Sequence, residues 1–115
     1  MLSAALVATA PLGADPARVV DAAAEREGHG WRFSVTPRHC DTGWDDHADG
    51  WRVPAPSGEV PGTRELLHPH VTEQPFTRSL AGVVVPEGVT DVRLESSTTR
   101  TGWSGETRTL RLAGE

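Results

Sequence analysis

The chain contains no lysine, only one cysteine and, apart from Met1, no methionine. All 11 basic residues are arginines, so mechanisms that need a lysine nucleophile or a lysine Schiff base are excluded. Because Cys40 has no second cysteine to pair with, an intramolecular disulfide framework is excluded as well. Cys40 is therefore expected to be either a buried, inert thiol or part of a site.

Basic residues are also too few and too scattered to form a cationic surface. The chain has 16 acidic residues and a formal net charge of -5, and its arginines form no cluster. This argues against a nucleic-acid groove or a surface for anionic membranes. A protein or glycan of unknown identity remains open as a partner.

No apolar run approaches the roughly 20 residues that a transmembrane helix needs. Residues 1–14 are apolar and small, and they end in Gly13-Ala14, which is typical of a signal peptide and its cleavage site. The basic segment that normally opens a signal peptide is missing, so we expect a truncated one. The sequence thus predicts a secreted or periplasmic protein.

Residues 15–115 have room for one domain with one hydrophobic core. Alternating apolar and polar residues, bounded by glycine and proline, predict short strands rather than helices. Such strands, with turn signals about every 8 to 12 residues, predict an all-β fold: an immunoglobulin-like or fibronectin III-like antiparallel β-sandwich of about seven strands. The expected strands are 18–26, 31–36, 50–53, 63–68, 76–80, 91–96 and 106–112, and residues 83–89 are expected to cross between the two sheets.

The first of these strands carries conflicting signals. Asp15, Pro16, an alanine-rich middle and Gly28 are typical of a helix with its caps. The apolar stripe of that helix would be too small to anchor it on a core. A strand that pairs with 31–36 is therefore the preferred interpretation, and the choice between strand and helix for 15–27 stays open.

Two segments are rich in potential metal ligands. Residues 39–49 hold two histidines, four aspartates and the lone thiol, and residues 68–73 hold two more histidines and a glutamate. His68 and His70 stand at i and i+2, so in an extended segment both imidazoles face the same side. Imidazole and thiolate suit copper or zinc, which predicts a site at one end of the sandwich. Its candidate ligands are His68, His70, Glu73, His39, Cys40 and His47.

None of these spacings matches a zinc finger, an HExxH helix or an EF-hand loop. The alternative is that His68 and His70 flank Pro69 at a strand end and bond to backbone, while the acidic loop is solvated. A further version places calcium on aspartate oxygens of the same loop.

Arg78 shares one strand face with Phe76 and Leu80, which are expected to point into the core. A guanidinium there needs a carboxylate partner. We therefore predict an ion pair between Arg78 and a carboxylate, with Glu73 or a carboxylate of the acidic loop as partner, acting as a structural clamp. The loop candidates are Asp41, Asp45 and Asp46.

Every tryptophan follows a glycine, which lets the backbone turn or approach closely where a large ring must fit. Trp31 and Trp51 are expected in the core. Trp44 and Trp103 are expected either to cover the ends of the sandwich or to form exposed stacking platforms for a sugar or peptide.

An enzyme would need Cys40 as nucleophile with His68 or His70 as base. No feature of the sequence places Cys40 at a helix start or in a positive field, and no Gly-x-Ser-x-Gly is present. We predict no enzymatic activity.

The block Leu66-Leu67-His68-Pro69-His70-Val71, continuing through Glu73-Gln74-Pro75-Phe76-Thr77-Arg78-Ser79, resembles a family of small uncharacterised exported bacterial proteins. The resemblance spans residues 19–112 and implies an exported β-sandwich with no assigned activity. From the two ligand-rich segments, and not from the resemblance, we expect a non-catalytic binding module with copper or zinc as ligand. The alternative is a structural or protein- or glycan-interaction module without metal.

Overall fold

The computed structural model describes residues 15–55 and 57–112, so the expected signal peptide at 1–14 lies outside the described residues. Seven strands form two antiparallel sheets that stack face to face, and no helix occurs in the described part. None of it therefore forms an apolar helix long enough to span a membrane. The expected all-β sandwich of seven strands is confirmed.

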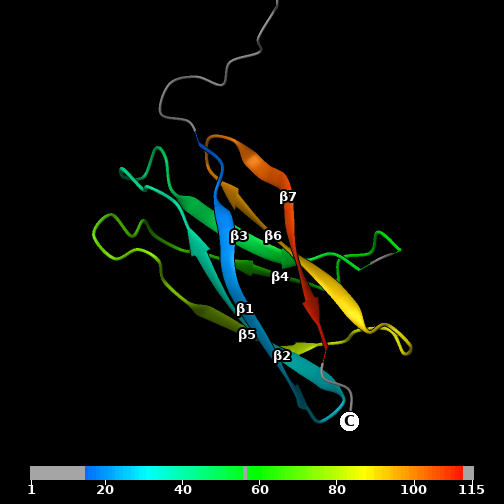
Figure 1. Ribbon diagram of the computed structural model, residues 1–115. Coiled ribbons are helices and arrows are strands. Elements are labelled where there is room, and N and C mark those ends of the chain that lie inside the picture. The colour runs from blue at the N-terminus through cyan, green and yellow to red at the C-terminus, as the bar shows by residue number, and fades with distance from the viewer. Residues whose placement is uncertain (1–14, 56, 113–115) are drawn as a thin grey trace, which may run out of the picture.

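The first sheet contains β1 (Arg18–Glu27), β2 (Gly30–Arg38) and β5 (Arg78–Val83), in the order β1-β2-β5. The second contains β3 (Ala48–Val53), β4 (Gly62–Glu65), β6 (Asp91–Thr98) and β7 (Gly102–Arg111), in the order β4-β3-β6-β7. Figure 1 shows the strands of the two layers crossing at an angle. β4 belongs to the same sheet as β3, β6 and β7. In an immunoglobulin constant domain, by contrast, the fourth strand lies in the sheet that contains the first two strands.

The open question about residues 15–27 is resolved in favour of a strand. β1 pairs with β2 from Arg18 to Glu27, and Gly28 closes the hairpin with a φ of 62°. Val19, Ala22 and Ala24 pack against the core. Pairing along the whole strand outweighs the weak helix preference of its alanines, because propensity is a small term beside tertiary contacts.

The inner faces of both sheets form one core. β2 contributes Trp31, Phe33 and Val35, and their alternation with polar residues explains why this strand was evident in the sequence. Trp51 is completely buried between the sheets, and Trp31 is 6% exposed, so both expected core tryptophans are confirmed. The remaining large members of the core include Val53, Leu66, Phe76, Val83, Val92, Leu94 and Leu112.

Every strand differs from its expected bounds by at least one residue, and β7 begins at Gly102 instead of residue 106. Two of these differences have a visible cause. The strand expected at 63–68 ends at Glu65, because the amide of Leu66 turns to bond the carbonyl of Asp49. The strand expected at 76–80 begins at Arg78, and Phe76 is instead buried in the preceding loop. Residues 84–90 cross between the sheets, as expected.

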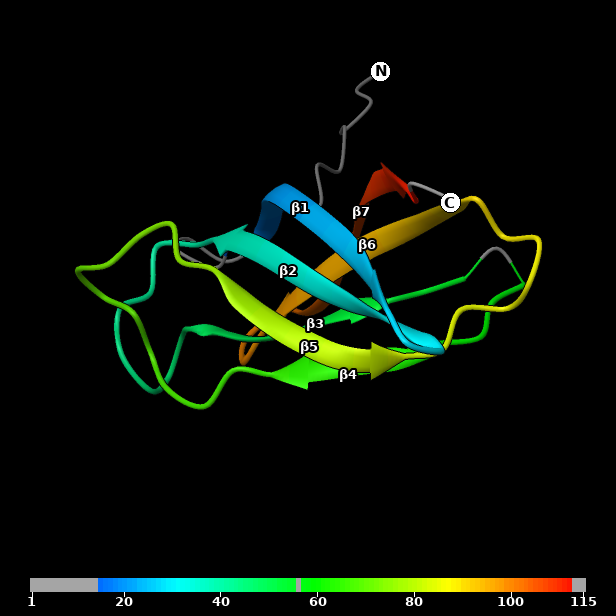
Figure 2. The ribbon, with the colours of Figure 1, turned by 90° about the horizontal axis from the view of Figure 1, so that it is seen from below.

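Three connections meet at one end of the sandwich: residues 39–47 between β2 and β3, residues 66–77 between β4 and β5, and the turn at 99–101. We call this the loop end. Figure 2 shows the first two of these loops side by side at the left, opposite the connections 54–61 and 84–90 at the right.

Candidate functional site

The carboxylate of Asp41 holds the loop end together. Its side chain is completely buried and accepts three hydrogen bonds. Oδ1 accepts from the ring of His39 at 2.7 Å and from the amide of Ala48 at 3.0 Å, and Oδ2 accepts from the amide of His70 at 2.8 Å. One buried carboxylate thus joins loop 39–47 to loop 66–77 across the gap between the sheets.

Two further contacts strengthen this junction. Gln74 accepts a hydrogen bond from the amide of His39 and donates one to the carbonyl of His70. On the other side, the amide of Thr99 donates to the carbonyl of His47, and the Thr99 hydroxyl donates to the carbonyl of Asp45. All three connections of the loop end are therefore fixed to one another, and the backbone polar groups that irregular loops would otherwise leave unpaired are satisfied.

His39 is a structural residue in this arrangement. It is 5% exposed, with Nδ1 on Asp41 and Nε2 at 2.9 Å from the carbonyl oxygen of Asp15 and 3.6 Å from Asp46. An aspartate that orients a histidine is also part of a catalytic triad, but there the second nitrogen faces a nucleophile. Here it faces a backbone oxygen, and the exposed Cys40 makes no hydrogen bond to an imidazole in the described part of the chain.

His70 is held in a stack of side chains. Its ring lies parallel to Phe76 with centroids 3.8 Å apart, and the ring of His68 follows at 4.6 Å. Nδ1 of His70 lies 3.2 Å from Glu73, and Nε2 lies 3.4 Å from a guanidinium nitrogen of Arg78. Both ring nitrogens of His70 are therefore engaged, while His68 is exposed and its Nδ1 lies 3.2 Å from the carbonyl of Pro69.

The two segments with potential ligands do meet, but they do not form a coordination set. Within residues 15–55 and 57–112, no three His, Cys, Asp or Glu side chains converge on a point that could hold a metal ion. His47 is buried with Nδ1 at 3.2 Å from the carbonyl of Trp44, and Cys40 points to solvent. Of the six candidate ligands, His70 lies 3.2 Å from Glu73 and packs its ring against that of His68, with centroids 4.6 Å apart.

The ion pair expected for Arg78 is replaced by other contacts. Arg78 lies on the inner face opposite Val35, as its alternation with Leu80 indicated, but at the rim, where it is half-buried. Its guanidinium lies 5.3 Å from the centroid of Phe76, near His70, and donates to the carbonyl of Thr77. Among the described residues it pairs with none of Asp41, Asp45 and Asp46, because Asp41 and Asp46 face His39 and Asp45 is exposed.

Three large apolar side chains of the loop end are exposed. Trp44 is 68% exposed, Leu67 71% and Val71 55%, and they stand on the two long loops that Asp41 joins. The Trp44 ring packs edge-on against His47 with centroids 5.6 Å apart. An exposed platform was one of the two roles that the sequence left open for Trp44, but Leu67 and Val71 carried no signal, because an isolated apolar residue in a loop is equally compatible with burial.

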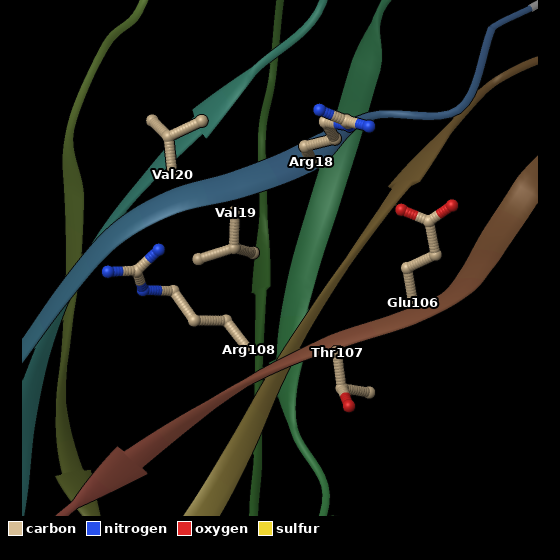
Figure 3. A pocket seen from close by; sticks show the side chains of 6 residues that line it. All are labelled: Arg18, Val19, Val20, Glu106, Thr107 and Arg108. Atoms are coloured by element: carbon tan, nitrogen blue, oxygen red, sulfur yellow. The ribbon is translucent and has the colours of Figure 1, made fainter.

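Hollows also lie elsewhere on the molecule. One of about 360 Å³ lies at the seam between β1 and β7, and Figure 3 shows Arg18 and Val19 on the β1 side and Glu106 and Arg108 on the β7 side. A second hollow, of 290 Å³, lies beside Trp103 on the outer face of the four-stranded sheet. Trp103 therefore does not cover an end of the sandwich.

Comparison with known proteins gives one match. The chain is 41% identical over 99 residues to a protein named "Putative lipoprotein" from Halomicrobium mukohataei, a match that covers 85% of this chain. The chain spans about half of that relative, 48% of its length. No family model matches the chain, and no solved structure matches it.

Proposed function

We propose that this chain is an exported, non-catalytic binding module that binds a protein partner through its loop end. The observation that supports this most directly is the contrast between the two sides of the loops. Inside, the buried Asp41 carboxylate fixes both long loops; outside, the same loops present Trp44, Leu67 and Val71 to solvent.

Fixed loops with apolar tips are suited to recognition. Association costs free energy for every loop and side chain that must become ordered, so loops that are ordered beforehand bind more tightly for the same contact area. Exposed aromatic and aliphatic side chains that cluster mark interaction surfaces, and tryptophan is among the residues that contribute most to binding. The loop end has loops that are ordered by internal bonds, and it exposes a tryptophan and two aliphatic side chains on them.

Export is supported by two independent features. The relative carries the name of a lipoprotein, and residues 1–14 have the composition of a signal peptide. A non-catalytic role is supported by the environment of the buried imidazoles, since His39 and His70 use their ring nitrogens for internal contacts. For copper or zinc binding, the other function that the sequence indicates, the described part of the chain offers no comparable grouping of ligands.

Site-specific photocrosslinking in the envelope of the producing cells tests the proposal. A photoreactive phenylalanine derivative replaces Val71 at the loop end or, as a matched control, Val84, which is 64% exposed on a connection at the opposite end. We expect a discrete covalent adduct with one protein from position 71 and none from position 84. Trp44→Ala in the position-71 protein should reduce the adduct severalfold. Equal adducts from both positions, or none from position 71, would refute the loop end as a protein-binding surface.

A further inference from the structure

The outer face of the four-stranded sheet contains a trough built by one cross-strand row. Glu65, Gly50, Ser97 and Trp103 are register neighbours across β4, β3, β6 and β7. Register neighbours point to the same face of a sheet. The two central strands thus contribute the smallest side chains, and the two outer strands contribute a carboxylate and an indole. The resulting hollow has a volume of about 290 Å³.

Gly50 keeps the floor of the trough low. A Cβ at this position would lie 3.4 Å from the Ser97 hydroxyl, 3.3 Å from the carbonyl oxygen of Arg64 and 3.8 Å from the far edge of the Trp103 ring. A glycine inside a strand is unfavourable for the strand itself and often marks the close approach of another molecule or chain. Here it lets the edge of the indole lie close over the backbone of the central strands.

The indole that forms one wall is fixed in place. The guanidinium of Arg52 lies 4.0 Å from the ring centroid of Trp103 and is paired with Glu95 at 2.8 Å. Glu95 also accepts the amide of Gly105 from β7 itself, at 2.8 Å. Trp103 is nevertheless 37% exposed. A large aromatic surface that is both accessible and ordered binds a ligand with little loss of conformational entropy.

Polar groups of several kinds surround this ring. Asp49 accepts a hydrogen bond from Ser97, which orients its carboxylate on the trough side. Arg64 contributes backbone to the lining, because its register partner Trp51 points between the sheets and its guanidinium bonds the carbonyls of Ser79 and Glu65. The hydroxyl-bearing residues Thr63 and Ser97 also line the trough. Carboxylates and hydroxyls therefore lie close to one aromatic ring.

The charges favour a neutral ligand. Anions are disfavoured by the carboxylates of Asp49 and Glu65 in the lining. Cations usually bind to the face of an indole. That interaction is already made by Arg52, whose charge opposes a second cation on the same ring. What remains is a neutral molecule with one C–H face for the indole and several hydroxyls for the rim.

We propose that this trough binds a pyranose unit of a neutral glycan. The axial C–H groups of a pyranose form an apolar face that packs on Trp103, and its hydroxyls donate to Asp49 and Glu65. The volume lies at the lower limit of ligand pockets, about 300 Å³, which suits one sugar ring rather than a folded partner. This site is separate from the loop-end surface proposed above.

Binding to defined oligosaccharides tests the proposal. The probes are cellohexaose, maltohexaose, mannohexaose and chitohexaose, with polygalacturonate and choline as charged controls, first on an array and then by calorimetry. We expect at least one neutral probe to bind at micromolar to millimolar concentration and neither charged control to bind. Trp103→Ala and Asp49→Asn should each weaken binding about tenfold or more.

Trp44→Ala is the matched control, because it removes an exposed tryptophan from the loop end and should leave the affinity unchanged. Amide hydrogen exchange is also measured on the unmodified protein, with and without the bound probe, so this result does not depend on whether a variant folds. The probe should slow exchange at residues 49, 50, 97 and 103. The proposal is overturned by any of four results: no neutral probe binds, a charged control competes, Trp103→Ala binds normally, or Trp44→Ala abolishes binding. None of these results affects the crosslinking test of the loop end.

Discussion

Asp41 is the residue on which the loop end depends, so its removal gives the sharpest test of the structure. Asp41→Ala withdraws the acceptor from three donors at once: the amides of Ala48 and His70 and the ring of His39. A buried donor left without a partner costs about 1 to 3 kcal/mol. The three costs will not add fully, because the loops relax and water enters, so we expect a loss of about 3 to 5 kcal/mol.

Such a loss is large beside the roughly 5 to 15 kcal/mol that stabilises a typical domain. Urea unfolding, followed by tryptophan fluorescence, should show a lower midpoint with an unchanged slope. Asp41→Asn keeps one acceptor oxygen but turns an amide group toward a donor, so it should cost about 1 to 3 kcal/mol. The control Asp45→Asn changes an exposed neighbour and should stay within about 0.5 kcal/mol of the unmodified protein.

Hydrogen exchange locates the effect. In Asp41→Asn, the amides of Ala48 and His70 should lose protection before those of the core strand β2. Two results would contradict this role of the carboxylate: a free energy of unfolding of Asp41→Ala within about 0.5 kcal/mol of that of the unmodified protein, or a His70 amide that keeps its protection in Asp41→Asn. Either would show that Asp41 does not hold the two loops together, and the argument for ordered binding loops would fail.

Three further predictions concern two serines of β6, the pairing of β2 with β5, and metal binding. Ser96 is fully buried and its hydroxyl has no partner among the described residues, so Ser96→Ala should be neutral or stabilise the protein by up to about 1 kcal/mol. Ser97→Ala loses the hydrogen bond to Asp49 and should destabilise the protein by about 0.5 to 1.5 kcal/mol. If thermal unfolding shows Ser96→Ala to be the less stable of the two variants, the assigned contacts are wrong. Gly30→Ala places a Cβ 3.1 Å from the carbonyl oxygen of Val83, and this overpacking should cost about 1 to 3 kcal/mol in urea unfolding; a cost near zero would show that β2 and β5 are less closely paired than described. Micromolar copper or zinc should leave the melting temperature unchanged, and a rise that His68→Ala with His70→Ala abolishes would restore the metal site.

The strand content could be predicted because each strand carries its own signal. In β2 apolar and polar residues alternate, and Gly28 supplies the positive φ that closes the first hairpin. β1 was ambiguous for the same reason, since its alanines favour a helix locally and only the pairing with β2 decides. Strand ends were less accurate, because Leu66 and Phe76 leave their strands to satisfy contacts made by other loops.

The candidate site was only partly accessible from the sequence. The sequence identified the two segments that meet at the loop end and the exposed Trp44. The role of Asp41 could not be found, because four similar aspartates stand in the acidic loop and only the packing of residues 66–77 gives Asp41 the amide of His70 as a partner. The trough beside Trp103 was equally hidden, since its walls and floor come from four strands in an order that the chain does not follow.

The sequence by itself determined the fold class, the absence of lysine and disulfide chemistry, and the positions of the large apolar residues, because these follow from composition and from local alternation. The tertiary structure alone decided which polar groups are used up in internal contacts and which remain for a ligand. The physical reason is that a histidine or carboxylate acquires its role from the partners that burial gives it. Those partners, from Asp41 with His70 to Gly50 with Trp103, are distant along the chain.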